Sequence, residues 1–191
     1  MNQVFLKAAA GALLTLAIAP AFAHGPGAHA AVPSTAPASL DASPLEGQGL
    51  RKYLFDAARA GDVAVLKSLL ARGVDVNLRD ERGSTALILA AYYGKSDAVQ
   101  ALLDAGASPN LGDSARGNTA LMGALFRGES ESARKLLADT RTDVNARNAA
   151  GQTAAMFAAL FGRGDLVEAL AARKADFALT DASGATAEAL A

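Results

Sequence analysis

One stretch of sequence recurs along the chain with a period of 33 to 34 residues. Each copy opens with a glycine, a variable residue and a threonine, and the four threonines are Thr85, Thr119, Thr153 and Thr186. In three copies a second glycine follows nine residues after the threonine, at Gly94, Gly128 and Gly162. A period of about 20 to 50 residues is typical of solenoids and other arrays. The chain is therefore predicted to be a stack of similar units, each packed on its neighbours.

Each unit carries the signals for two helices. Thr85 and its equivalents stand where a helix opens, and a hydroxyl there can accept a hydrogen bond from an N–H group of the first turn. Gly94 ends this first helix and Gly106 ends the second, since glycine supplies the backbone freedom that a helix C-terminus needs. The second helix carries one apolar stripe, at Ala98, Val99, Leu102 and Leu103. A single unit cannot bury that stripe, so neighbouring units must stack.

These residues resemble the ankyrin repeat, whose pattern is G-x-T-P-L-H-x-A-A-x-x-G, then an apolar helix and L-L-x-x-G-A-D-V-N. The second unit matches it at Gly83, Thr85, Leu87, Ala90, Ala91, Gly94, Leu102, Leu103, Gly106, Ala107 and Asn110. The resemblance implies an all-α ankyrin-repeat solenoid of helix-turn-helix units with short, outward, β-hairpin-like loops. We expect the repeat domain at residues 47–191, with units at 47–79, 80–113, 114–147 and 148–180 and a C-terminal cap at 181–191.

The chain also departs from the ankyrin pattern. The proline and histidine of T-P-L-H are replaced, and we expect packing by Ile88, Met122 and Met156 to stand in for the hydrogen bonds of the histidine. One extra residue lies in 112–116 and another in 139–143, so these two loops are expected to deviate. The first unit lacks the Gly-x-Thr opening, and the last is abbreviated, as in terminal capping units.

Catalytic residues are scarce in the repeats. The chain has no cysteine, and its two histidines, His24 and His29, precede the first unit. Ser–His–Asp and Cys–His machinery and His-ligated zinc are therefore excluded from the repeats. The densest acidic spots, Asp80-Glu81 and Glu129/Glu131, fall at loop and helix starts, where acidic residues are structurally favourable. We predict no enzyme activity, cofactor or metal, and the net charge of -1 gives no basic footprint for nucleic acid.

The N-terminus has the pattern of an export signal. Lys7 precedes an apolar run over 8–19, and Ala21-Phe22-Ala23 supplies a cleavage pattern, so residues 1–23 are predicted to be a Sec-type signal peptide. An uncleaved anchor is the alternative. Residues 24–46 are rich in proline and alanine and are expected to form a flexible linker. Its histidines are either solvated or, at a new N-terminus, able to bind copper or nickel. The mature protein is expected in the periplasm, without stable membrane insertion after cleavage.

The resemblance implies that the two positions before each helix-ending glycine face a concave groove. In this chain those positions hold Arg59, Ala60, Tyr92, Tyr93, Phe126, Arg127, Leu160 and Phe161. Aromatic side chains interrupted by arginine are typical of interaction hot spots. The alternative is that one residue of each pair packs as core. The loop tips add mixed charges, at Arg79, Asp80, Glu81, Arg82, Asp113, Ser114, Arg116, Arg147, Asn148 and Asp181.

The expected partner-binding residues before the glycines are Arg59, Tyr92, Tyr93, Phe126, Arg127, Leu160 and Phe161. Arg82 and Arg116 of the loop tips are expected to join them. The sequence predicts a monomeric, exported adaptor or scaffold that binds a periplasmic protein through its concave face. An immunity-type inhibitor of a periplasmic enzyme or toxin is the alternative, and the two differ in whether the bound partner is active or silent. A hydrolase that uses carboxylates is a third class, which would need turnover abolished by one acidic substitution.

Overall fold

The computed structural model describes residues 44–191, with side chains from residue 49 onward. The predicted signal peptide and most of the predicted linker, with His24 and His29, lie outside this range. The chain from 44 onward forms nine helices. They are α1 (Pro44–Ala60), α2 (Val63–Ala71), α3 (Ala86–Tyr92), α4 (Ser96–Asp104), α5 (Ala120–Arg127), α6 (Ser130–Ala138), α7 (Ala154–Leu160), α8 (Gly164–Ala172) and α9 (Ala187–Leu190). Helix α1 begins three residues before the boundary expected at residue 47.

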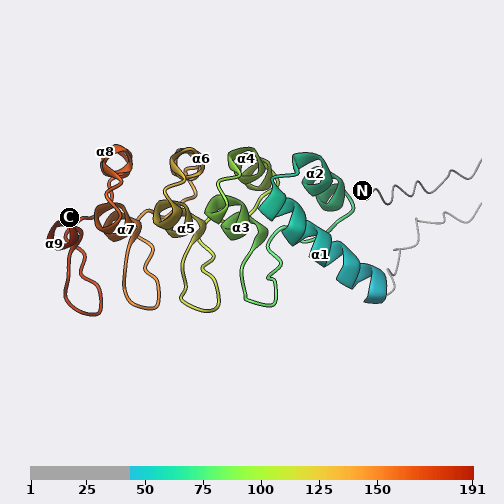
Figure 1. Cartoon of the computed structure of the whole chain (residues 1–191), viewed down its shortest axis with the longest axis horizontal. Helices are drawn as coiled ribbons and strands as arrows, with labels where there is room; N and C mark the ends of the chain where they lie inside the picture. Colours follow the sequence, from blue (N-terminus) through green and yellow to red (C-terminus); the bar gives the residue numbers. More distant parts are fainter. Residues whose placement is uncertain (1–43) are drawn as a thin grey trace, which may run out of the picture. The chain divides into compact units, whose positions relative to one another are not determined.

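The helices of the repeat domain lie in two rows (Figure 1). Helices α1, α3, α5, α7 and α9 form an inner row, in which each helix packs on the next. Helices α2, α4, α6 and α8 form an outer row with the same neighbour-to-neighbour packing. Long loops leave the inner row on the side away from the outer helices (Figure 1). The all-α solenoid expected from the repeat is confirmed.

The loops are hairpin-like without being strands. Between residues 44 and 191 the β-structure amounts to one isolated antiparallel bridge, between Arg79 and Thr85. At the base of the second-unit tip the backbone N–H of Asp80 donates to the carbonyl of Ser84 at 2.9 Å, and Asp181 repeats this bond to Ala185. Such short pairings give a tight turn but no extended ladder.

The core consists of small and branched apolar side chains repeated in register. The predicted stripe on α4 is buried throughout, and alanines Ala90 and Ala91 allow α3 to pack closely on its neighbours. Ile88, Met122 and Met156 are at most 7% exposed. Packing therefore occupies the position that the family pattern gives to histidine, as expected.

Three of the four repeat threonines cap a helix in the predicted way. The hydroxyl oxygens of Thr85, Thr119 and Thr186 accept from the N–H groups of Ile88, Met122 and Ala189 at 3.2, 3.4 and 3.2 Å. The prediction is wrong for Thr153, whose buried hydroxyl has no hydrogen-bond partner in the described chain. Its backbone is extended, as at the other three threonines, so the difference lies in the side-chain hydrogen bond.

Both loops with an extra residue deviate, as predicted. In the longer tip the N–H of Gly117 donates to Asp113, four residues back, whereas Gly83 donates to Asp80, three residues back. In the second case the extra residue leaves Asp139, the C-cap of α6, in an extended conformation. Both insertions lie outside the helices, and the inner helices still pack each on the next.

Asparagine side chains join the units where the loops begin. The side-chain oxygens of Asn77, Asn110 and Asn145 accept from the backbone N–H groups of Ser108, Asp143 and Asp176, each in the following unit, at 2.8 to 2.9 Å. These bonds give the repeated asparagine a physical role, because each fixes the register of one unit against the next.

Candidate functional site

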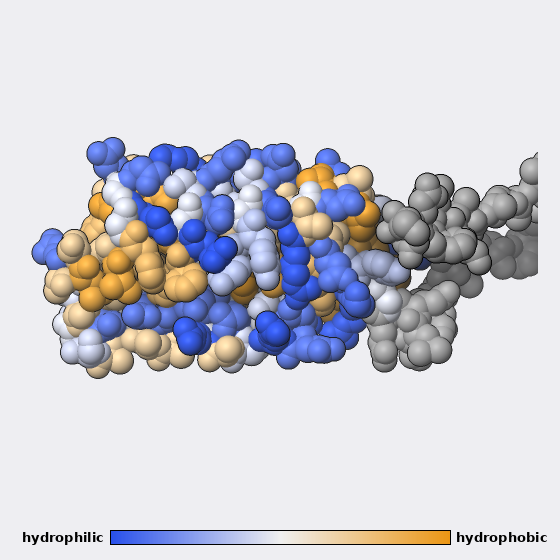
Figure 2. All heavy atoms as spheres, viewed as in Figure 1, coloured by the Kyte–Doolittle hydropathy of each residue, from blue (hydrophilic) through white to orange (hydrophobic). Residues whose placement is uncertain are grey.

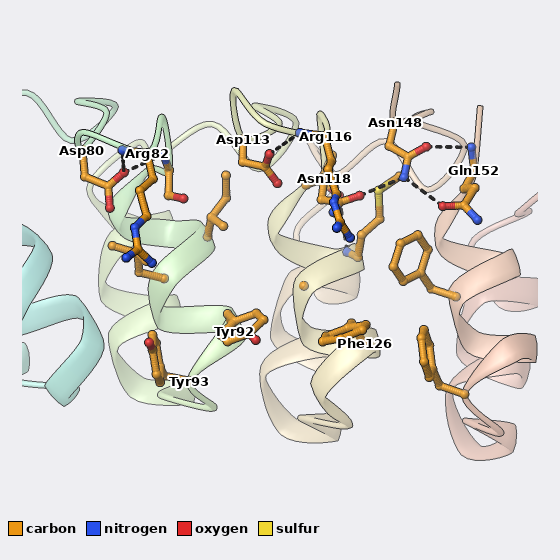
Figure 3. Close-up of a pocket in the computed structure, with 18 of the residues that line it drawn as sticks. Asp80, Arg82, Tyr92, Tyr93, Asp113, Arg116, Asn118, Phe126, Asn148 and Gln152 are labelled. Atoms are coloured by element: carbon orange, nitrogen blue, oxygen red, sulfur yellow. Dashed lines mark hydrogen bonds between the residues drawn. The ribbon is translucent and has the colours of Figure 1, made fainter. Parts of the chain in front are cut away.

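A groove of about 530 Å³ runs along the inner helices α3, α5 and α7 and the loops that precede them. Its helical side carries aromatic and aliphatic side chains, and its loop side carries polar ones (Figure 3). Tyr92, Tyr93, Phe126, Leu160 and Phe161, all predicted from the repeat, line it together. The sequence-based expectation that the positions before the glycines share one surface is therefore met for these five residues.

The aromatic rings form a continuous row across three units. The ring centroids of Tyr92 and Phe126 lie 6.2 Å apart with nearly parallel planes. Those of Phe126 and Phe161 lie 5.1 Å apart, edge to face, and Tyr93 packs edge-on against Tyr92 at 5.3 Å. Offset-stacked and edge-to-face pairs are the favourable geometries of aromatic rings. The row is thus held in place by its own contacts before any ligand arrives.

The five aromatic and leucine side chains remain accessible from the groove. Tyr93, Phe126 and Leu160 are 47%, 44% and 51% exposed, whereas Tyr92 and Phe161 are half-buried. The alternative, in which one residue of a pair becomes core, therefore does not describe these pairs. A single exposed apolar side chain is ordinary, but a contiguous group on a concave surface is typical of a binding site. Figure 2 shows such an apolar patch over the C-terminal part of the stack.

Of the groove residues that were not anticipated, Phe157 and Gly123 lie beside the aromatic row. Phe157 lies 6.0 Å from Phe161, ring centroid to ring centroid, and extends the row within α7. The equivalent position on α5 is Gly123, where an added Cβ would only reach van der Waals distance, 3.9 Å, from Tyr92. Gly123 therefore leaves a hollow beside Tyr92. The place of Phe157 beside Phe161 could have been predicted from the sequence, because the two residues are four positions apart and share one helix face.

The acidic and amide residues of the loop tips are part of the fold. One side-chain oxygen of Asp80 accepts from the N–H groups of Arg82 and Ser84 at 3.0 and 2.9 Å. Asp113 and Asn148 accept two backbone N–H groups each in the same manner (Figure 3). In the last loop the Ser183 hydroxyl and the N–H of Ala185 hold the pKa of Asp181 below its ordinary value. Turn chemistry therefore sets the placement of these side chains, and Asp80, Asp113 and Asn148 also line the groove.

The predicted arginines fall into three environments. Arg59 is half-buried and pairs with Asp80 at 3.0 Å and with Asp56 at 3.2 Å. Arg82 and Arg116 line the groove, are exposed, and have no acidic partner within 4.0 Å in the described chain. Arg127 lies outside the lining of the groove, and its guanidinium sits 5.1 Å from the ring centroid of Tyr92. A cation there stacks on the ring and supports the row.

The acidic spots considered for catalysis lie apart from the groove floor. Asp80 is engaged in its turn and with Arg59, and Glu129 and Glu131 lie at the start of α6 in the outer row. Within residues 44–191, no three His, Cys, Asp or Glu side chains group as metal ligands do. In the same range, no helix has the length and apolarity to cross a membrane.

Comparison with known proteins gives one consistent result. A family model of three ankyrin repeats matches residues 54–148, and a second ankyrin-repeat model matches 131–171. A mitochondrial disaggregase of Bos taurus is 45% identical over 80 residues, 42% of this chain and 10% of that protein. The ankyrin repeat protein YahD of Escherichia coli is 49% identical over 61 residues, 32% of this chain and 30% of that protein. The ankyrin repeat protein PA3287 of Pseudomonas aeruginosa is 41% identical over 56 residues, 29% of this chain and 33% of that protein. The matched segments thus span no more than about a third of these curated relatives.

Proposed function

Since the chain belongs to the ankyrin repeat family, a family of protein-binding modules, we propose that it is an exported adaptor that binds a periplasmic protein in its concave groove. The aromatic row from Tyr93 to Phe161 carries this proposal. It presents accessible apolar surface at the centre of the groove, where interface hot spots cluster, with polar side chains at the edge. Rings already ordered by contact with one another lose little conformational entropy when a partner binds.

Export is proposed from the sequence of residues 1–23, with its charged start, short apolar run and Ala-Phe-Ala pattern. The test is fractionation of a Gram-negative host that expresses the whole chain and a variant lacking residues 2–23. The proposal expects the first in the periplasmic fraction with a shortened N-terminus by mass spectrometry, and the second in the cytoplasm. Full-length chain retained in the cytoplasm would contradict it.

Protein binding is tested by affinity capture from periplasmic extract followed by direct binding of the captured protein. The test variant carries Tyr92→Ala, Phe126→Ala and Phe161→Ala, and the control carries Lys67→Ala, Arg134→Ala and Glu168→Ala in the outer row. Circular dichroism establishes that both are folded. We expect the groove variant to lose the partner, with a Kd at least about a hundredfold weaker because each anchor contributes more than about 1 kcal/mol, and the control to keep it. Unchanged binding by a folded groove variant would refute the concave-face site.

A further inference from the structure

The groove changes character along the stack. At the α5–α7 end it presents Phe126, Leu160 and Phe161. At the α1 end it opens into a second hollow, of about 960 Å³, that shares Arg59, Asp80 and Arg82 with the first. The lining of this second hollow is mainly charged, with Arg51, Lys52, Asp56, Arg59, Arg79, Asp80, Glu81 and Arg82. Figure 2 shows the same change along the stack, with hydrophilic residues toward α1 and the apolar patch toward the C-terminal helices.

The charges at the α1 end do not cancel. Asp56 is paired with Lys52 at 2.7 Å and with Arg59, and Asp80 is paired with Arg59. These pairs satisfy both aspartates. Arg82 and, one loop further along, Arg116 make no ion pair and donate no side-chain hydrogen bond in the described chain, although both are exposed at the edge of the groove. Among the acidic residues of this hollow, Glu81 is the one that lacks an ion-pair partner within the described residues. The hollow as a whole carries five cationic side chains, Arg51, Lys52, Arg59, Arg79 and Arg82, against three carboxylates, Asp56, Asp80 and Glu81, so this end of the groove is positively charged.

The middle of the groove offers hydrogen-bond donors. The amide nitrogen of Asn148 donates to the side-chain oxygens of Asn118 at 2.8 Å and Gln152 at 3.2 Å (Figure 3). This network uses the oxygens of Asn118 and Gln152 and leaves their NH₂ groups without an acceptor in the described chain. Both residues line the groove. Donors of this kind suit the free carbonyl groups of an extended peptide. The carbonyl groups of a helical peptide are already hydrogen-bonded within the helix.

We propose that the occupant of the groove is an extended protein segment with apolar side chains on Phe126, Leu160 and Phe161 and acidic side chains on Arg82 and Arg116. This inference rests on the proposed function and adds the chemistry of the partner. Packed helices are about 8–10 Å apart, so the two units between Arg82 and Phe161 separate these residues by about 20 Å along the stack. An extended chain rises about 3.3 Å per residue. An acidic residue on Arg82 and an apolar residue on Phe161 are therefore about six positions apart, and pairs that use Arg116 or Phe126 are closer.

A single-stranded nucleic acid would also combine negative charge with flat rings, but the geometry disfavours it. The ring faces of Tyr92 and Phe126 lie against each other, and the edge of one ring meets Phe161, so few faces are open for base stacking. The second hollow, into which the groove opens, also exposes the carboxylate of Glu81. Both features suit a peptide better than a phosphate backbone.

The test uses the whole chain with a random twelve-residue peptide display library, followed by binding measurements on synthetic copies of the enriched peptides. Enriched sequences are expected to carry Asp or Glu within about six positions of Phe, Leu or another apolar residue. Arg82→Glu with Arg116→Glu is expected to weaken their binding at least about tenfold, through lost attraction and added repulsion. The matched control, Lys67→Glu with Arg72→Glu in the outer row, changes net charge equally and is expected to bind like the unaltered chain. Peptides with Lys in place of Asp and Glu should bind the Arg82→Glu, Arg116→Glu variant better than the unaltered chain.

The outcomes separate this inference from the proposed function. Enrichment of peptides without acidic residues, or equal binding by the Arg82→Glu, Arg116→Glu variant, would refute the charge assignment while leaving a groove that binds protein. A single-stranded oligonucleotide that binds more tightly than the selected peptides would also overturn the inference. Selected peptides that bind equally to the folded Tyr92→Ala, Phe126→Ala, Phe161→Ala variant would refute the groove itself, and with it the proposed function.

Discussion

The unpartnered hydroxyl of Thr153 gives the sharpest test of how the stack is held together. Thr153 and Thr85 occupy the same position of the repeat and are 1% and 2% exposed, yet only Thr85 caps its helix with its hydroxyl. Replacement by valine keeps the shape of the side chain and exchanges the hydroxyl for a methyl group. The same substitution should therefore have opposite effects in two units of one protein.

The magnitudes follow from the local hydrogen bonds. Thr85→Val removes the cap and strands the N–H of Ile88, which costs about 1–2 kcal/mol. Thr153→Val removes no hydrogen bond of the described chain. It also removes the cost of burying a hydroxyl without a partner, so the free energy of unfolding should rise by about 1 kcal/mol. The free energies of unfolding should thus differ by about 2–3 kcal/mol. For a chain of this size, about 1 kcal/mol shifts Tm by 2–4 °C, so the two variants should melt about 4–12 °C apart.

The assay is urea and thermal unfolding of the whole chain followed by circular dichroism, with amide exchange of α7 as a local readout. The exchange measurement matters because a unit near one end of a stack can open separately from the rest. Thr153→Val is expected to slow exchange in α7. If Thr153→Val destabilised the protein by as much as Thr85→Val, its hydroxyl would be satisfied and the reasoning would be refuted.

Three further predictions concern contacts between and within units. Arg173 donates to the carbonyls of Leu137, Asp139 and Thr142, so Arg173→Leu should lower the free energy of unfolding by about 2–4 kcal/mol. Arg72→Leu, at the matching position of the first unit, should change the free energy of unfolding by less than about 0.5 kcal/mol. Equal losses for the two variants in urea unfolding would contradict this prediction. A Cβ at Gly112 would lie 2.3 Å from the carbonyl oxygen of Gly117, so Gly112→Ala should lower the free energy of unfolding by about 1–3 kcal/mol. Gly164 lies in open space at the start of α8, so Gly164→Ala should leave the free energy of unfolding unchanged or raise it by up to about 1 kcal/mol. Hydrogen bonds from Arg141 lower the pKa of Asp139 below its ordinary value. The ionised Asp139 therefore stabilises the folded state fully at a pH above its pKa in the unfolded chain, and this stabilisation is lost as the pH falls through its pKa in the folded chain. An NMR titration should show the Asp139 pKa return toward its ordinary value in Arg141→Gln, and an unchanged pKa would exclude Arg141 as the cause.

The groove could be predicted only in part. The row of Tyr92, Tyr93, Phe126, Leu160 and Phe161 followed from the repeat, because equivalent positions of stacked units must lie side by side. Arg127 shares the sequence position of Tyr93 and yet stacks on Tyr92 instead of lining the groove. Its direction depends on a neighbouring ring 35 positions away, which no local pattern encodes.

The charges show the same limit. Arg59, Arg82 and Arg116 look alike in the sequence, but Arg59 is neutralised by Asp80 of the next unit. Arg82 and Arg116 make no ion pair within the described residues. Which arginine is available to a partner was therefore decided by contacts across the interface between units.

The sequence by itself determined the period of the stack, the helix boundaries and the buried stripes. The period is visible as one pattern that recurs every 33 to 34 residues. The helix boundaries and buried stripes depend on residues within about one turn of one another, such as Thr85 with Ile88, or Leu102 with Val99. The tertiary structure alone decided that Thr153 caps nothing, that Gly123 opens a hollow beside Tyr92, and that the groove is basic at one end and aromatic at the other. The hollow and the two ends of the groove arise between residues about 20 to 40 positions apart, and they depend on how far and at what angle one unit lies against the next.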